Sequence, residues 1–243
     1  IPQATETIGN YVFAKCTNLQ DVIFNDRTTP LLLGSNDKEP LFVDCPLDSV
    51  YIGGNISYDT GIFNSTDGIK STTGFSPFHL NQSLRTVKIA NGEDDITEYM
   101  FRYCSNLQHI YIGDDVASIG DYAFAYCISL PTISIPQSTK SVGEYAFKGC
   151  SKLSDVIIEN RTETIELGHN DSSPLFADCP LDSVYIGGKI SYSTASTDGY
   201  SPFYRNYSLR TVKITHNEET VYDNEFYGCT GLNTLDLPST VTT

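Results

Sequence analysis

The hydrophobic positions of this chain recur in one three-residue pattern. A Leu is followed three residues later by an apolar residue, usually Val or Ile, and another apolar residue comes two positions after that. The second and third members point to the same face of an extended strand, so they are predicted to face inward. Nine copies occur, and each predicts one short strand: Leu19/Val22/Phe24, Leu47/Val50/Ile52, Leu84/Val87/Ile89, Leu107/Ile110/Ile112, Leu130/Ile133/Ile135, Leu153/Val156/Ile158, Leu181/Val184/Ile186, Leu209/Val212/Ile214 and Leu232/Leu235/Leu237.

A phenylalanine precedes each triplet at a nearly constant interval. The segment around it, as in Tyr122-Ala123-Phe124-Ala125-Tyr126-Cys127, carries apolar residues at three-residue spacing. This spacing predicts a single helical or 3₁₀ turn against the strand layer. The register phenylalanines are Phe13, Phe42, Phe78, Phe101, Phe124, Phe147, Phe176, Phe203 and Phe226.

The fixed period indicates a solenoid. Phe101, Phe124 and Phe147 are 23 residues apart, and neither the strand nor the turn of one repeat could bury its apolar side alone. We therefore expect an α/β repeat of about nine rungs, with one short parallel strand per rung and helical or 3₁₀ turns on the convex side. No composition shift marks a boundary, so residues 1–243 are expected to form one domain.

A longer block of the chain is duplicated. Residues 19–90 resemble residues 153–215, and the run Asp44-Cys45-Pro46-Leu47-Asp48-Ser49-Val50-Tyr51-Ile52 recurs unchanged from Asp178 to Ile186. The wider Phe-to-Phe spacings place insertions at roughly residues 25–40, 53–76, 159–174 and 187–201, which are rich in Gly, Ser, Thr, Asn and Asp. Such segments are predicted to be loops that project from the rungs.

The amino-acid composition argues against some classes of binding partner for this chain. The formal net charge is −15, with 16 Tyr and no Trp, so the basic surface that nucleic acid requires is not expected and anionic membranes would repel the chain. No stretch approaches the roughly 20 apolar residues of a membrane helix. The chain begins inside a repeat and stops as if another rung were due. We expect a fragment of a longer exported protein, whose uncapped ends could self-associate.

The cysteines follow the repeat. All seven lie three residues after a register Phe, and Asn takes that place in the other two copies. A position that accepts either residue favours buried free thiols, with disulfides between stacked rungs or a metal site as the alternatives. The predicted structural ladder is Cys16, Cys45, Asn81, Cys104, Cys127, Cys150, Cys179, Asn206 and Cys229.

The consensus Ile-Gly-x-x-Ala-Phe-x-x-Cys-x-x-Leu-x-x-Ile-x-Ile-Pro resembles the BspA-like family of bacterial leucine-rich repeats. The match covers nearly the whole chain and is most specific at residues 99–158. The copies with Cys-Pro-Leu or Ser-Pro-Phe depart from the consensus, which leaves their local rung geometry open. The resemblance implies a right-handed leucine-rich-repeat solenoid on a secreted or surface-attached bacterial protein, associated with adhesion, and it transfers no catalytic motif and no cofactor.

The alternation also predicts which residues point outward from the strands. Against the acidic body this strip is nearly neutral and carries tyrosines, which suit recognition surfaces. The predicted ligand-binding residues are Tyr51, Lys88, His109, Tyr111, Tyr185 and Lys213. The alternative interpretation is that these residue types simply suit a sheet face and that Tyr185 repeats Tyr51 through the duplication.

The sequence contains no clear catalytic or metal-binding motif. His79, His109, His169 and His216 lack a nucleophile or second ligand at a meaningful spacing, and we expect them to be solvated. The acidic runs 91–95 and 217–219 lack the ligand spacing of a calcium loop, although weak calcium binding there stays open. Two functions remain: a non-enzymatic adhesin-like module that binds a protein or glycan on a host or bacterial surface, or a structural spacer without a ligand.

Overall fold

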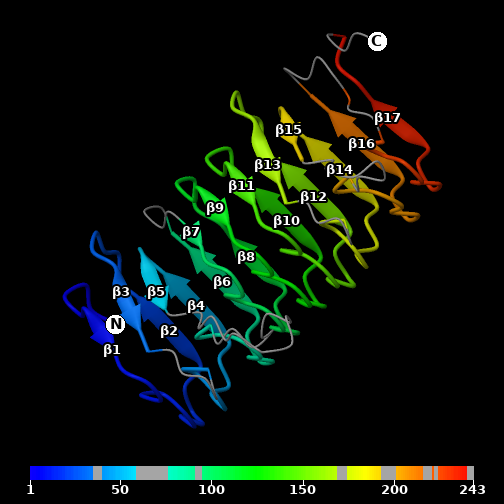
Figure 1. Ribbon diagram of the computed structural model, residues 1–243. Coiled ribbons are helices and arrows are strands. Elements are labelled where there is room, and N and C mark those ends of the chain that lie inside the picture. Colours follow the sequence, from blue (N-terminus) through cyan, green and yellow to red (C-terminus); the bar gives the residue numbers. More distant parts are fainter. Residues whose placement is uncertain are drawn as a thin grey trace, which may run out of the picture.

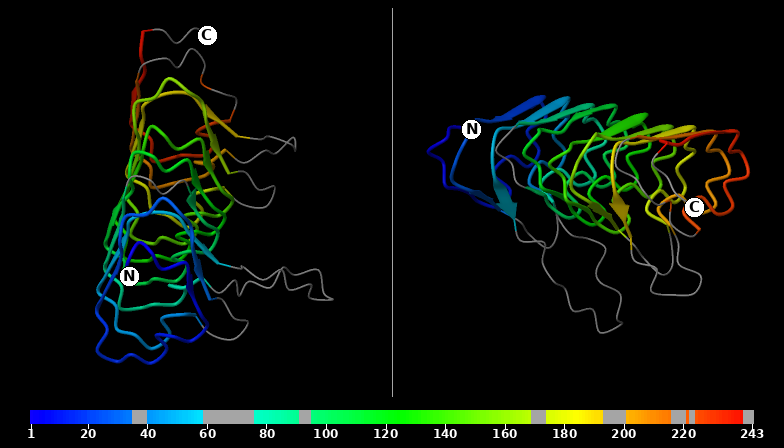
Figure 2. Two further views of the ribbon diagram at one scale, coloured as in Figure 1. Left: turned by 90° about the vertical axis from the view of Figure 1, so that its left-hand side faces the viewer. Right: turned by 90° about the horizontal axis from the view of Figure 1, so that it is seen from above.

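The chain coils into a parallel β-solenoid whose rungs stack in sequence order (Figure 1). In this computed structural model the described residues are 1–34, 40–58, 76–90, 95–168, 174–192, 201–215, 221 and 224–239. The strands form two ladders on different sides of the coil (Figure 2). The core lies between the ladders along the whole stack.

The first ladder holds the strands that the triplets predict. We call its outer surface the strand face. Neighbouring strands are parallel and in register, so that Val156 of one strand pairs with Ile133 on one side and Val184 on the other. The strands are β2 (Asp21–Phe24), β4 (Ser49–Ile52), β6 (Thr86–Ile89), β8 (His109–Tyr111), β10 (Thr132–Ile135), β12 (Asp155–Ile158), β14 (Ser183–Ile186), β16 (Thr211–Ile214) and β17 (Thr234–Asp236).

Hydrogen bonding in this ladder is interrupted between β8 and β10, which divides it into a four-stranded and a five-stranded sheet. In the other rungs, the residue before the strand donates its backbone N–H to the preceding rung, as Gln108 does to Arg85 and Ser154 to Pro131. Pro131 occupies this position in the β10 rung, and a proline has no N–H to donate. The ladder therefore breaks where the sequence places a proline.

The second ladder was not predicted. Its strands are β1 (Thr7–Ile8), β3 (Leu31–Leu33), β5 (Ile56–Tyr58), β7 (Asp95–Ile96), β9 (Ser118–Ile119), β11 (Ser141–Val142), β13 (Ile165–Leu167) and β15 (Ile190–Ser191). They form the parallel sheets β1-β3-β5 and β15-β13-β11-β9-β7. Four of them lie in segments predicted to be projecting loops: β3, β5, β13 and β15. Those segments are thus part of the rung for at least two or three residues each.

The turn around each register Phe is not helical, so the prediction of helical or 3₁₀ turns was wrong. The described residues contain no helix. The residue two positions after every register Phe has a positive φ: Lys15, Asp44, Leu80, Tyr103, Tyr126, Gly149, Asp178, Arg205 and Gly228. A left-handed residue ends a right-handed helical turn.

Hydrogen bonds between rungs hold this left-handed backbone in place. Tyr103 and Tyr126 donate their backbone N–H to the carbonyls of Ala125 and Lys148 in the next rung, at 2.9 and 2.7 Å. Phe124 does the same to Ala146 at 2.8 Å. The turn segments therefore bond to the next rung in addition to the bonds within each turn, such as that from Cys127 N–H to the Phe124 carbonyl at 3.1 Å.

The register phenylalanines form a continuous column in the core. Successive rings are stacked, with centroids 5.2 to 5.6 Å apart from Phe13 to Phe226. Stacking at this distance adds to the free energy gained by burying the rings. The Leu and the two apolar residues of the triplets fill the rest of the core, and they are buried in most rungs.

Buried arginines fill one corner of the solenoid in both duplicated blocks. Arg161 is 6 % exposed and donates to the backbone carbonyls of Thr139 and Pro136, at 2.5 and 2.8 Å. Its counterpart Arg27 donates to the carbonyls of Thr5 and Pro2. These cations satisfy carbonyls of the preceding rung and are not available to a ligand.

Candidate functional site

The strand face carries two rows of outward side chains, one for each outward position of the strands. The in-register pairing brings Tyr51 beside Lys88, and Lys88 beside Tyr111. In the other row, His109 lies beside Thr86. Four of the six predicted binding residues, Tyr51, Lys88, His109 and Tyr111, therefore lie on the three neighbouring strands β4, β6 and β8.

This first group combines an aromatic surface with a cation. The Lys88 Nζ lies 5.7 Å from the Tyr51 ring centroid, within the range of a cation–π contact. The Tyr51 hydroxyl donates to Asp26 Oδ1 at 2.6 Å. That hydrogen bond to the carboxylate raises the pKa of Tyr51. Tyr111 is 59 % exposed, so its ring offers the largest apolar contact in the group.

The second group, Tyr185 and Lys213, lies on β14 and β16 and repeats the pairing of Tyr51 with Lys88. Its polar contacts differ. The Tyr185 hydroxyl donates to Asn160 Oδ1 at 2.7 Å and lies 3.0 Å from Thr215 Oγ1. Lys213 lies 3.7 Å from Asp236, which takes the place that Tyr111 has in the first group. The second group therefore lacks the exposed aromatic ring of the first.

The six predicted residues do not form one continuous strip. Strands β10 and β12 separate the two groups, and they present Ser134 and Ile157 at the corresponding position. The break after β8 also lies between them. The first group is the larger continuous candidate for ligand contact.

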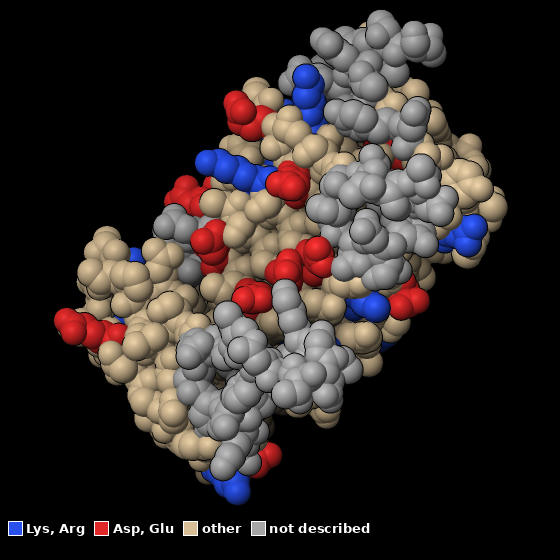
Figure 3. Space-filling view, in the orientation of Figure 1, with Lys and Arg blue, Asp and Glu red and all other residues tan. Residues whose placement is uncertain are grey.

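The surface charge agrees with the composition. In Figure 3, Asp and Glu are spread among the uncharged residues, and the Lys and Arg visible there form no continuous patch among the coloured atoms. Of the ion pairs between described residues, Arg85 with Asp48 at 3.0 Å and Arg210 with Asp182 at 2.9 Å are duplicates of each other and are largely exposed. On the strand face, the in-register pairing places Lys88 beside Tyr51 and Lys213 beside Tyr185.

The predicted cysteine column consists of free thiols, each donating to a backbone carbonyl in the preceding rung where it is buried. Cys127 Sγ lies 3.2 Å from the Phe101 carbonyl oxygen, and Cys150 Sγ lies 3.2 Å from that of Phe124. Asn81 and Asn206 instead donate Nδ2 to the carbonyls of Cys45 and Cys179. Cys16 differs from the expectation for the column because it is exposed.

This column predicts one reactive thiol in the folded protein. Burial raises the pKa of Cys127 well above its ordinary value, and the thiolate is the reactive form. We expect Ellman's reagent to modify Cys16 rapidly and the other six cysteines only on unfolding. Cys16→Ser should abolish the fast phase. Rapid modification of a second thiol in the folded Cys16→Ser variant would contradict the buried column.

His79 is not the solvated histidine that was expected. It is 6 % exposed and lies edge-on to Tyr103, with ring centroids 5.8 Å apart. Burial, assisted by the nearby Arg102 cation, lowers the pKa of His79 to about 4. Arg102 is itself buried among the rings of Tyr99, Tyr103 and Tyr122. This cluster could not be predicted from the sequence pattern because its members come from three different rungs.

No group of three or more His, Cys, Asp or Glu side chains in the described ranges could hold a metal ion. His169, His216 and most of the two acidic runs lie outside those ranges. No helix in the described part of the chain is long and apolar enough to cross a membrane.

The chain matches several solved structures of leucine-rich repeat proteins. One from Bacteroides ovatus matches with a TM-score of 0.54 and 21 % identity, over 79 % of this chain and 47 % of that one. The T. pallidum leucine rich repeat protein matches with a TM-score of 0.41 and 20 % identity, over 86 % and 70 %. A leucine rich cell surface protein from Faecalibacterium prausnitzii matches with a TM-score of 0.31 and 17 % identity, over 95 % and 82 %.

The likeness to the Bacteroides ovatus protein, at 21 % identity, extends to the fold alone. The chain spans about half the length of the Bacteroides ovatus protein. No curated protein matches the sequence.

A sequence model of one protein family matches almost the whole chain. The model of the BspA type leucine rich repeat region matches in six copies, over residues 1–76, 71–197 and 196–243. Its repeat is the one that the Phe column, the cysteine column and the in-register strands describe. The chain belongs to the BspA-type leucine-rich repeat family.

Proposed function

We propose that this protein is a non-enzymatic binding module of a secreted or cell-surface bacterial protein, with an adhesin-like role. The observation that carries the proposal is the row Tyr51–Lys88–Tyr111 on the strand face, where a cation lies between two aromatic rings. Tyrosine supplies a large contact area with a polar tip, and such residues dominate binding energy at protein interfaces. The ligand class is a protein or glycan on a host or bacterial surface.

A structural spacer is the second candidate, and one observation favours it. The Tyr185 hydroxyl is engaged by Asn160 and Thr215, and the Tyr51 hydroxyl is engaged by Asp26. Side chains held in this way also stabilise a sheet that has no ligand. If the protein is a spacer, neither the parent chain nor a variant without the three tyrosines of the strand face binds a ligand.

A binding screen separates the two functions. The purified chain is applied to immobilised matrix proteins, mucins and glycans beside a Tyr51/Tyr111/Tyr185→Ala triple variant. We expect saturable binding by the parent chain and a loss of affinity of about tenfold or more in the variant, since central aromatic residues cost about 2 kcal/mol or more on truncation.

The melting temperature serves as the control for folding. Unchanged binding by a folded triple variant would remove the strand face from the site. Absence of binding by both proteins would favour the spacer.

A further inference from the structure

Two rungs of the solenoid have a turn that is one residue shorter than the others. The interval from the register Phe to the last triplet residue is 11 residues in seven copies but 10 in the copies of Phe42 and Phe176. In these two, the sequence Cys-Pro-Leu closes a tighter turn, and Leu181 donates its backbone N–H to Cys179 only two residues back. In full-length rungs, as at Leu107 and Cys104, the same bond spans three residues.

The rung that follows each short turn has an asparagine in place of the cysteine of the column. Asn206 Nδ2 reaches back to the Cys179 carbonyl oxygen at 2.8 Å, and its Oδ1 accepts a hydrogen bond from Ser208 at 2.9 Å. Asn81 makes the same two contacts with Cys45 and Ser83. The step between a short turn and a full-length turn leaves an open groove at both places.

The two grooves are equivalent in the duplicated blocks. The first groove has a volume of about 520 Å³ and lies between the turns of Phe42 and Phe78. The second groove has a volume of about 690 Å³ and lies between the turns of Phe176 and Phe203. Both volumes fall within the range of small-molecule sites, roughly 300–1,000 Å³. They share one frame: an Asp, a Cys and a Pro on one wall, and an Asn and a Ser opposite.

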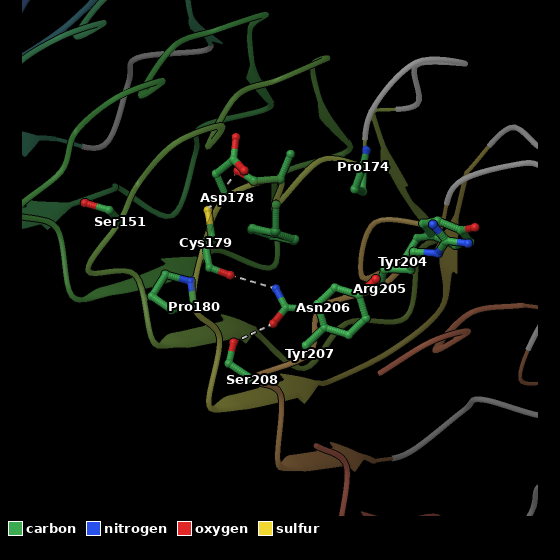
Figure 4. Close-up of a pocket in the computed structure, with 12 residues that line it drawn as sticks. Ser151, Pro174, Asp178, Cys179, Pro180, Tyr204, Arg205, Asn206, Tyr207 and Ser208 are labelled. Atoms are coloured by element: carbon green, nitrogen blue, oxygen red, sulfur yellow. Dashed lines mark hydrogen bonds between the residues drawn. The ribbon is translucent and has the colours of Figure 1, made fainter. Parts of the chain in front are cut away.

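The walls of the two grooves have diverged at the residues that flank the asparagine. The first groove has Leu80 and Gln82 there, and the second has Arg205 and Tyr207. Figure 4 shows Asp178 and Pro180 on one side of the second groove, with Tyr204, Arg205 and Tyr207 across from them. Beside the asparagine, the second groove thus has a cation and an aromatic ring where the first has a leucine and a glutamine.

These added groups are available to a ligand. Tyr207 is 61 % exposed. The Arg205 guanidinium lies over the Tyr204 ring, 5.1 Å from its centroid. Neither Arg205 nor Asp178 pairs with the other or with another charged side chain in the part of the chain that the structure describes. Opposed acceptors and donors beside an exposed ring suit a ligand that has both hydroxyl groups and an apolar face.

We propose that the second groove binds a neutral oligosaccharide, whose sugar ring packs on Tyr207 while its hydroxyl groups bond to Asp178 and Arg205. The net charge of −15 disfavours an anionic ligand, and Arg205 disfavours a cationic one. The exposed carboxylate and guanidinium would have to be desolvated to hold a purely apolar molecule. This site lies outside the strand face and goes beyond the function proposed above.

The first groove supplies the matched variant. In the double variant Arg205→Leu/Tyr207→Gln, the second groove receives the residues of the first at the two positions that flank the asparagine. Leu80 has the same left-handed backbone conformation as Arg205, with φ of 61° and 53°, so the exchange keeps the turn. Both replaced side chains are exposed, and we expect the variant to fold with an unchanged melting temperature.

The test measures binding of maltopentaose, cellopentaose, xylopentaose and chitopentaose by saturation-transfer NMR and isothermal titration. We expect at least one of these sugars to bind the parent chain in the micromolar to millimolar range, and the double variant to bind it about tenfold or more weakly. The Tyr111→Ala variant, which alters the strand face alone, should bind the sugar as the parent does. The two variants therefore test the groove and the strand face separately.

Three results would overturn the proposal. The first is absence of saturable binding to all four sugars. The second is equal affinity of the parent and the folded double variant. The third is a groove that accepts peptides from a random library, with binding lost in the double variant, while it accepts no sugar.

Discussion

Replacing Phe124 by Ala is expected to lower the free energy of unfolding by about 3–5 kcal/mol. The Phe124 ring is fully buried and stacks on Phe101 and Phe147, with centroids 5.5 and 5.6 Å away. Removing it leaves a cavity between two rings and interrupts the column that links neighbouring rungs. Because stability in a repeat array resides largely in the interfaces between rungs, the loss should spread to both sides. Urea unfolding followed by circular dichroism measures the change.

Phe13→Ala is the matched control for this substitution. Phe13 is partly buried, and among the described residues its ring stacks on Phe42 alone. We expect its loss to cost clearly less than that of Phe124. Equal costs for the two variants, or a cost below about 1 kcal/mol for Phe124→Ala, would show that the column is not the main source of cohesion.

Acid should weaken the fold through His79. In the folded protein its pKa is about 4, whereas the ordinary value is 6.5. Above pH 6.5 the imidazole is neutral in both states and costs nothing. As the pH falls from 6.5 to 4, the unfolded chain takes up the proton first, so the free energy of unfolding falls. Since one pKa unit corresponds to 1.36 kcal/mol, the full loss approaches about 3 kcal/mol.

The many carboxylates of this acidic chain also titrate in that range, so the His79 contribution is measured as a difference. The free energy of unfolding of the parent and of His79→Gln is determined from pH 7.5 to pH 4. We expect the parent to lose stability relative to the variant as the pH falls, by about 2–3 kcal/mol. Parallel pH profiles would mean that His79 has the same pKa in the folded and the unfolded protein.

The strand face and the core column were predictable because their signals are long and regular. Each triplet places two inward residues on a strand, and nine phenylalanines recur in step with them. The pairing of Val22 with Val50 and of Val50 with Val87 follows from aligning the copies. A residue pattern that repeats in register therefore predicts the pairing partners as well as the strand.

The second ladder could not be found in the same way. Strands such as β9 and β11 contain only two residues, one of which is buried. Two residues are too few to show an alternation. These strands form because the stacked rungs bring their backbones together. Their position therefore depends on how the whole chain coils and not on the local sequence.

The left-handed turns and the grooves were missed for a different reason. Tyrosine and leucine rarely adopt a positive φ, so Tyr103 and Leu80 gave no warning of one. Hydrogen bonds to the next rung stabilise the conformation, since the Leu80 N–H donates to the Arg102 carbonyl. The shortened Cys-Pro-Leu turns were visible in the sequence, but their consequence, an open step between rungs, depends on the full-length turn that follows.

Most of the variation in rung length lies in one arc, and this has a practical use. From the register Phe to the end of the strand the interval is 10 or 11 residues in all nine copies, whereas from there to the next Phe it ranges from 12 to 26. An engineer who wished to graft a peptide epitope or a second binding segment would insert it in the variable arc, where natural copies already differ. The nearly constant length of the Phe-to-strand segment also explains how such proteins could diversify by gene duplication and small insertions. Changes confined to the variable arc leave the stacked strands and the phenylalanine column in place.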